Sequence, residues 1–278
     1  MGLIDFILNL AGLLLWLNWR AAKADPLGKS KPATLIGTLR RAEPGKARRW
    51  HLPAALGGLL LLRALFYWQI GSALKPAWAG TLDFGVIAPS FVSSSFWRIL
   101  LFSIFSFARM VGIVYLWLIL LSILVGPMPT HRLVKIQLGN IDGWPRWMKF
   151  LLPLALVGLL WWLASWILAW MGIIPKPISA MHRIEESLVI GLGSYLVWKF
   201  LIATLLVLHL LNSYVYFGKN PFWNYVNATA RQLLRPLEKV RLRAGRADFA
   251  PIVGIALVFL LAELGGRAII YIYGRLPI

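Results

Sequence analysis

The chain has 278 residues, of which 59% are hydrophobic, and its mean hydropathy is +0.72. A water-soluble domain of this length does not carry so much apolar surface, so the composition indicates a membrane protein. The chain has no cysteine, which excludes disulfides, thiolate metal sites and thiol nucleophiles within it.

Six apolar segments approach the roughly 20 residues that an α-helix needs to cross a bilayer. They are Leu3–Trp19, Leu52–Leu74, Trp97–Val125, Phe150–Met171, Ser187–Tyr216 and Ala250–Tyr273. The first is short and contains Asp5, Asn9 and Asn18. It lacks the basic start and the cleavage site of a signal peptide, so we expect a retained spanning helix. The long loop Lys75–Phe96 is predicted to be a re-entrant or interfacial segment.

Lysine and arginine are concentrated in alternate connections. The first, third and fifth carry nine, four and seven of them, whereas the second has Lys75 and the fourth has Lys176 and Arg183. By the positive-inside rule the basic connections face the cytoplasm, which places both termini on the other side. This distribution explains the net charge of +19 by contact with anionic lipids and not with nucleic acid. We expect a bacterial inner membrane, or alternatively a thylakoid or other photosynthetic membrane.

An internal repeat accompanies this alternation. The run Pro53–Leu60 is repeated at Pro153–Leu160, and a looser copy begins at Pro251. Each proline is expected in the first turn of a helix, where its missing N–H has no partner. The repeat predicts an all-α integral membrane protein with six transmembrane helices in three tandem helix–interfacial segment–helix units. Their approximate bounds are 1–75, 97–172 and 187–274, within a single membrane domain, 1–278.

The segment after Asn220 has helical periodicity. Apolar residues recur at steps of three and four, with basic residues between them: Trp223, Val226, Ala230, Leu233, Leu234 and Leu237. This predicts a basic amphipathic helix that ends near Pro236 and lies in the membrane interface. Shorter versions begin near Leu35 and at Leu133, the latter with Ile136 and Leu138. The alternative for all three is a solvated linker.

Three motifs resemble those of the YggT/YlmG family of small integral membrane proteins. They are Asn220-Pro221-Phe222, Leu234-Arg235-Pro236-Leu237 and Asp248-Phe249-Ala250-Pro251-Ile252-Val253, and the resemblance covers about residues 220–263. The chain lacks the Pro- and Gly-rich run that precedes the aspartate in the family, and it has three units where the family has one or two. The resemblance implies a non-enzymatic role, such as the assembly of membrane complexes or a role in division.

The positions matched to the family are Asn220, Pro221, Phe222, Arg235, Pro236, Asp248 and Pro251. Residue preference predicts that Asn220 and Asp248 cap helices. Arg235 is expected either to bind a phosphate headgroup or to pair with Asp248.

Ionisable residues inside apolar segments are costly there and are candidates for function. They are Arg63, Arg109, Lys199, Glu263 and Arg267. Glu263 and Arg267 are four residues apart and can pair on one helix face, or Lys199 can pair with Glu263 instead. Such residues serve either an ion or proton path or an internal salt bridge, with Arg63 and Arg109 snorkelling or bound to lipid. A proton path needs several carboxylates, and Glu263 is the one expected deep in a span.

No cofactor is predicted. His209 is the one histidine inside a predicted span, so it is a weak candidate for a haem ligand, and a headgroup-facing or hydrogen-bonded histidine is the alternative. Trp162, Trp166 and Trp170 form a stripe suited to lipid or to a neighbouring subunit, or alternatively to a pigment.

The sequence predicts no enzyme, because phosphate-binding loops, metalloprotease motifs and nucleophile–base groupings are missing. We expect a scaffold, assembly factor or accessory subunit whose partners are anionic lipids and other integral membrane proteins. The alternatives are a channel or transporter with a path near Lys199, Glu263 and Arg267, and a haem- or pigment-contacting subunit.

Overall fold

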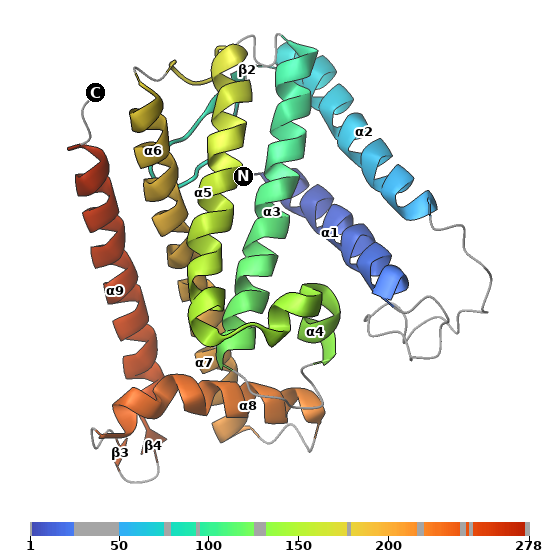
Figure 1. Cartoon of the computed structure of the whole chain (residues 1–278). Helices are drawn as coiled ribbons and strands as arrows, with labels where there is room; N and C mark the ends of the chain where they lie inside the picture. The colour runs from blue at the N-terminus through green and yellow to red at the C-terminus, as the bar shows by residue number, and fades with distance from the viewer. Residues whose placement is uncertain are drawn as a thin grey trace. The chain divides into compact units, whose positions relative to one another are not determined.

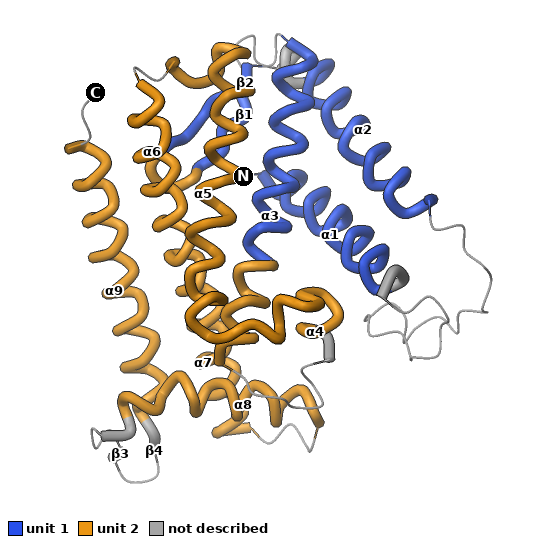
Figure 2. The backbone as a smooth tube through the Cα atoms, viewed as in Figure 1, with its two compact units in different colours: residues 1–83, 87–114 blue, residues 84–86, 115–278 orange. Residues whose placement is uncertain are grey.

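The computed structural model describes residues 2–24, 50–74, 79–92, 95–124, 132–176, 179–215, 220–239, 243–244 and 247–275. Within these ranges the backbone is almost entirely helical, and six helices are long and apolar enough to span a membrane (Figure 1). The predicted all-α, multi-pass membrane fold is therefore confirmed. The chain divides into two compact units, residues 1–83 with 87–114 and residues 84–86 with 115–278 (Figure 2).

Unit 1 contains three helices whose sequences are mostly apolar but which bury several polar residues where they pack together. They are α1 (Leu3–Ala24), α2 (His51–Leu74) and the first part of α3 (Phe96–Leu124). Gly12 of α1 allows a close approach, because a Cβ there would lie 2.9 Å from the ring of Phe107. The first predicted span is thus a full helix despite its polar residues.

A two-stranded hairpin lies in the connection between α2 and α3, where the sequence predicts a re-entrant or interfacial segment and no strands. Strand β1 (Ala79–Thr81) pairs antiparallel with β2 (Ser90–Val92). Phe91 is fully buried and its ring centre lies 5.8 Å from that of Phe102. The strands pair some of each other's backbone N–H and C=O groups, so this connection can be buried against the start of α3.

Besides residues 84–86, unit 2 contains the remainder of α3 and three further spans. The first is α5 (Arg146–Trp170), and the last is α9 (Ala250–Tyr273). Between them α6 (Ala180–Gly193), the 3-10 turn η4 (Ser194–Val197) and α7 (Trp198–Tyr214) form one continuous span. The shorter elements are α4 (Arg132–Leu138), η3 (Gly139–Gly143), α8 (Pro221–Leu234), η5 (Arg235–Lys239), β3 (Arg243–Ala244) and β4 (Ala247–Asp248).

The helices α5 and α6 approach until their backbones touch. A Cβ at Gly191 would lie 2.7 Å from the carbonyl oxygen of Leu154, and one at Gly158 would lie 3.1 Å from that of Ser187. Small residues at a crossing point allow this packing, which is typical of membrane helices.

The repeated prolines differ in their positions. Pro53 and Pro251 lie in the first turns of α2 and α9, as expected. The prediction for Pro153 is wrong, because α5 begins at Arg146 and Pro153 lies buried inside it. The extended residue Pro145 precedes the helix, and the apolar residues after it continue the helical run. Pro153 has no N–H, so the carbonyl of Lys149 lacks its usual helical partner.

The amphipathic character of α8 is confirmed. Its buried residues are Val226, Thr229, Ala230 and Leu234, and the 3-10 turn η5 follows at Arg235. Ala230 and Leu234 form a core cluster with Leu206 of α7. Figure 1 shows α8 crossing the ends of α7 and α9. Its apolar face is therefore covered largely by this unit.

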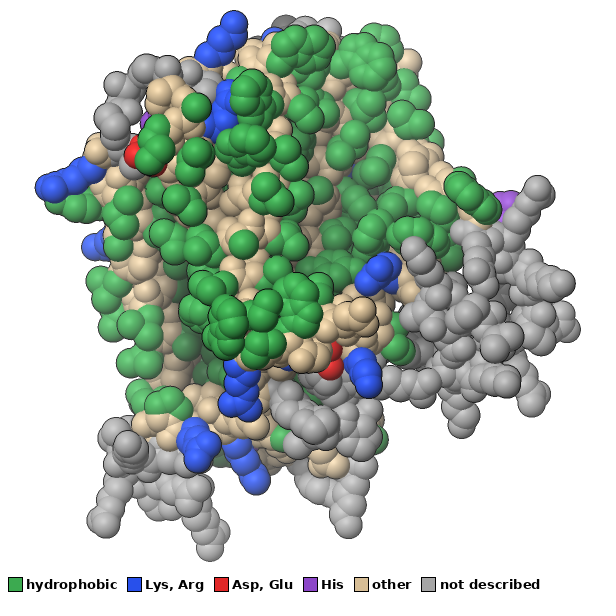
Figure 3. Space-filling view, in the orientation of Figure 1, with side chains coloured by type: hydrophobic (Ala, Val, Ile, Leu, Met, Phe, Trp, Pro, Cys, Tyr) green, Lys and Arg blue, Asp and Glu red, His purple; other side chains and the backbone are tan. Residues whose placement is uncertain are grey.

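The shorter amphipathic segment α4 buries part of the face that was expected, since Leu138 is buried. In α4, Val134, Gln137 and Leu138 are buried, and Ile136 is half-buried. Val134 and Leu138 pack against Ile119 of α3. The segment near Leu35 lies outside the described residues. Figure 3 shows an apolar surface along the helix flanks, with Lys and Arg mainly toward the helix ends, as membrane insertion requires.

Candidate functional site

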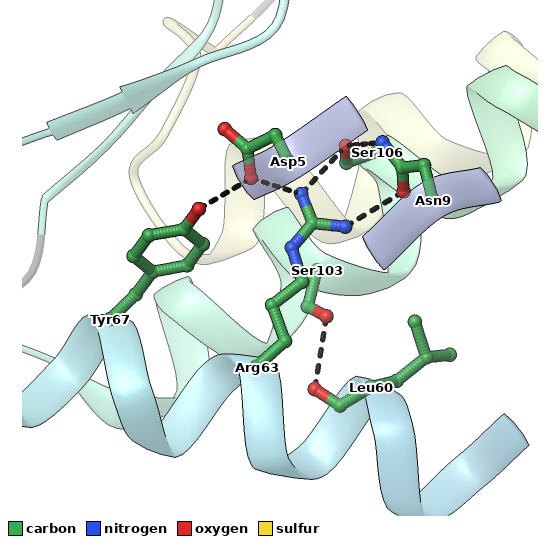
Figure 4. A network of polar contacts seen from close by, with 7 residues as sticks. All are labelled: Asp5, Asn9, Leu60, Arg63, Tyr67, Ser103 and Ser106. Atoms are coloured by element: carbon green, nitrogen blue, oxygen red, sulfur yellow. Dashed lines mark hydrogen bonds and ion pairs between the residues drawn. The ribbon is translucent and has the colours of Figure 1, made fainter. Parts of the chain in front are cut away.

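The most concentrated polar site in unit 1 surrounds Arg63 of α2, which is 1% exposed (Figure 4). Its Nη2 donates to Oδ1 of Asp5 at 2.8 Å and to Oγ of Ser106 at 2.9 Å, and its Nη1 donates to Oδ1 of Asn9 at 2.8 Å. One guanidinium therefore connects three helices.

Further hydrogen bonds tie these partners to one another. Tyr67 donates its hydroxyl to Oδ1 of Asp5 at 2.7 Å, and Asn9 donates Nδ2 to Ser106 at 3.0 Å. The guanidinium carbon lies 5.3 Å from the centre of the Phe102 ring. The spacing fits helical geometry, because Asp5 and Asn9 on α1 are four residues apart and so share a face.

This site corrects two expectations. Arg63 does not snorkel to the headgroups, because its carboxylate partner Asp5 lies within the same unit. Glu263 is not the one carboxylate deep in a span, since Asp5 on α1 and Glu186 on α6 are both buried. Hydropathy treats Asp5 and Asn9 as weaknesses of the first helix, and it cannot indicate that an arginine 58 residues from Asp5 neutralises it.

The network around Arg63 can hold helices together. Opposite charges attract strongly where the dielectric constant is low, provided that other hydrogen bonds complete their shells. Here one oxygen of Asp5 accepts two hydrogen bonds, and the guanidinium donates three. These groups hydrogen-bond to one another, so the network has the geometry of a structural link between α1, α2 and α3.

In unit 2 the predicted pair of Glu263 and Arg267 is confirmed. Nε of Arg267 lies 3.0 Å from Oε1 of Glu263, and their side chains are 74% and 63% exposed, respectively. In α9, all of whose residues are described, Pro251 and Gly254 are the buried ones. The pair thus lies on an outward, otherwise apolar helix surface.

The other two intramembrane cations are half-buried. Lys199 of α7 lies with Nζ 5.1 Å from the centre of the Phe200 ring. Glu263 pairs with Arg267, so the expected alternative pairing with Lys199 is not the one found. Arg109 lies on α3 in unit 1.

The family-motif residues are placed around α8 and α9. Asn220 is the N-cap of α8, and its side chain accepts a hydrogen bond from the Phe222 N–H at 3.1 Å, which confirms its predicted role. Pro221 opens the helix, and Phe222, Arg235 and Pro236 are exposed. Pro251 is buried in the first turn of α9.

The expected cap at Asp248 has a different backbone position. The N-cap of α9 is Phe249, and Asp248 lies one residue earlier in β4, opposite Arg243. The side chain of Asp248 lies outside the described residues. Its pairing with Arg235 therefore remains a prediction.

The histidine candidate has a hydrogen-bonded partner. Nδ1 of His209 lies 2.8 Å from Oδ1 of Asn227, which joins α7 to α8. An amide oxygen can only accept, so Nδ1 carries the proton and Nε2 has a free lone pair if the ring is neutral. The described residues contain no cluster of three His, Cys, Asp or Glu side chains that could hold a metal.

A second polar cluster lies near η3. Ser122 donates to Oδ1 of Asp142 at 2.6 Å, and Nζ of Lys149 donates to the carbonyl oxygen of Asp142 at 2.6 Å. The hydroxyl of Tyr225 on α8 is buried without a hydrogen bond to any described residue. Burial, and secondly the negative charge of Asp142, raise the pKa of Tyr225 to about 12.

The tryptophans of α5 differ in their exposure. Trp166 and Trp170 are exposed, whereas the neighbouring Trp161 is buried and donates Nε1 to Oε1 of Glu186 at 3.0 Å. The contact between Trp161 and Glu186 was missed because Glu186 falls just outside the predicted span that begins at Ser187. Comparison with family models, with characterised proteins and with solved structures finds no match to this chain.

Proposed function

We propose that this chain is a non-catalytic scaffold, assembly factor or accessory subunit of a larger membrane protein complex. The observation that carries the proposal is the exposed pair of Glu263 and Arg267 on α9. Charged side chains facing hydrocarbon are costly even when they are paired. A transmembrane helix of another protein that carries polar side chains at the same depth would remove that cost.

The character of the remaining α9 surface supports the same role. Large apolar side chains on both sides of the pair are exposed: Leu257, Phe259, Leu260, Leu261, Leu264, Ile270, Tyr271 and Ile272. Such a surface suits lipid and a partner helix equally well. The polar pair favours a partner helix over lipid, because lipid tails cannot hydrogen-bond to the two charged side chains.

The network around Arg63 supports a structural role over transport. A conducting path needs polar groups that exchange partners with the moving ion. Asp5, Asn9 and Ser106 are instead all bonded to Arg63. The channel hypothesis near Lys199, Glu263 and Arg267 would need a partner to enclose the exposed pair.

We further propose membership of the YggT/YlmG family, three tandem units and a bacterial inner membrane location. The motifs at Asn220, Arg235 and Pro251 support the first of these. The occurrence of α4 and α8 between spanning helices supports the repeat. Basic residues of both elements and their neighbours, such as Lys135, Arg231 and Arg235, support a cytoplasmic position for α8 and non-cytoplasmic termini.

Affinity purification of the tagged full chain in mild detergent tests the proposed function. We expect a stoichiometric membrane partner, which is lost from the variant E263L/R267L and retained by E263D/R267K, because the latter keeps both charges. Retention of the partner by the leucine variant would contradict the role of α9. A partner-free chain that conducts ions in liposomes would support the transporter hypothesis, and a Soret band abolished by H209A would support haem binding.

A further inference from the structure

The first two turns of α6 concentrate buried polar atoms that lack partners. His182 Nδ1, Arg183 Nε and Glu185 Oε2 are covered from solvent and make no hydrogen bond with any described residue. Buried polar groups in folded proteins are almost always paired. Three such atoms within four residues mark a polar site at the start of α6 whose hydrogen-bonding capacity the described residues do not use.

Arg183 provides the positive part of the site. Its side chain is buried, with 7% of the residue exposed, and its guanidinium carbon lies 3.8 Å from the centre of the Trp166 ring. It forms no ion pair with any described carboxylate. A guanidinium stacked on an aromatic ring still presents N–H donors at its edge, in a geometry that suits phosphate oxygens.

Two carboxylates provide the negative part. Glu185 has the unpaired oxygen, and the buried carboxylate of Glu186 uses Oε1 to accept from Trp161. A ligand with only negative charge would be repelled by both. A ligand with a phosphate and an ammonium group complements the whole cluster.

The position of the site indicates where such a ligand comes from. Trp166 and Trp170 are 57% and 84% exposed in the last turns of α5, beside the start of the α6 span. Exposed tryptophan is enriched at the level of lipid headgroups. We therefore propose that this end of unit 2 binds a zwitterionic phospholipid, with its phosphate on Arg183 and its ammonium group on Glu185.

Titration of the delipidated full chain with short-chain phosphatidylethanolamine, followed by native mass spectrometry, tests the site. We expect tighter binding than for phosphatidylglycerol of the same chain length. R183Q should weaken phosphatidylethanolamine binding roughly tenfold or more, because it removes a charged hydrogen-bond donor. E185Q should remove the preference between the two lipids. K176Q is the matched control, since Lys176 is an exposed cation close to α6, and it should bind as the unchanged chain does.

A second variant guards against misfolding of R183Q. Trp166 is exposed, so W166L should fold, and loss of the stacking should weaken binding about threefold to tenfold. Unchanged phosphatidylethanolamine binding in folded R183Q or in W166L would overturn the proposal, and so would equal affinity for phosphatidylglycerol. Displacement of the lipid by inorganic phosphate alone would assign the site to a free anion and would also overturn it.

Discussion

Two ion pairs in apolar helices have nearly the same length and opposite exposure. Arg63 and Asp5 lie 2.8 Å apart with side chains 1% and 10% exposed. Arg267 and Glu263 lie 3.0 Å apart with side chains 74% and 63% exposed. The distance between charges therefore says little about their role, which depends on what surrounds them.

The surroundings set the consequence of losing one partner. Removing either member of a buried pair leaves a charge without compensation in a low-dielectric interior. The exposed ion pair lies within α9 alone, so neutralising both of its members removes no ion pair between helices. We infer that the buried pair serves folding and that the exposed pair serves recognition.

The largest expected effect comes from breaking the buried pair. D5L or R63M alone should lower the free energy of unfolding by about 3–5 kcal/mol, because the remaining charge stays buried. The double variant D5L/R63M should recover most of the loss. Reversible denaturation of the full chain in detergent measures the stability of all three variants. Single variants that stay within about 1 kcal/mol of the unchanged chain would contradict a structural role for the buried pair.

A smaller loss is expected where backbones meet without any charge. In G191A the new methyl group would lie 2.7 Å from the Leu154 carbonyl oxygen, which cannot move without shifting α5. We expect a loss of about 1–3 kcal/mol in the same assay. The matched control G193A has nothing within 4 Å and should be neutral or slightly stabilising. Equal effects of the two changes would argue against close packing of α5 on α6.

The half-buried Tyr225 lies between the two ion pairs in exposure, and its effect on stability should depend on pH. Its pKa is raised from 10.0 to about 12, so the folded state binds the proton more tightly than the unfolded state does. The stability gained is fully present below pH 10 and is lost as the pH rises through 12. Y225F should lose less stability over this range, as measured by thermal unfolding at each pH. An identical alkaline loss in both proteins would contradict the burial of this hydroxyl.

The smallest effect on stability is expected at the exposed pair. The double change E263Q/R267Q should alter the free energy of unfolding of the isolated chain by less than about 0.5 kcal/mol, because it leaves no unpaired charge on the apolar surface of α9. The same denaturation assay measures this. A loss comparable to that of D5L would mean that α9 is held to the rest of unit 2 by these charges.

The sequence predicts the elements better than their contacts. Apolar length is a local property, so hydropathy identifies all six spans, and the period after Asn220 predicts α8. The interior position of Pro153 is missed because Pro145, eight residues earlier, also permits a helix start. The hairpin of β1 and β2 is missed because strands of three residues have no periodic signal.

The candidate site shows the same limit. Glu263 and Arg267 are predictable as a pair because they are four residues apart on one helix. Asp5 and Arg63 are not, since their contact depends on which helices become neighbours and in what rotation. Arg183 attracts attention only through its burial, which no pattern in the sequence reports.

The central claim is that another protein covers the exposed pair on α9 in the membrane. The chain has no native cysteine, so a single cysteine placed at Leu264 can carry a photoactivatable cross-linker in native membranes. We predict one discrete protein adduct at this position, which disappears in the E263L/R267L background. Adducts with lipid alone, or the same protein adduct in both backgrounds, would contradict the account.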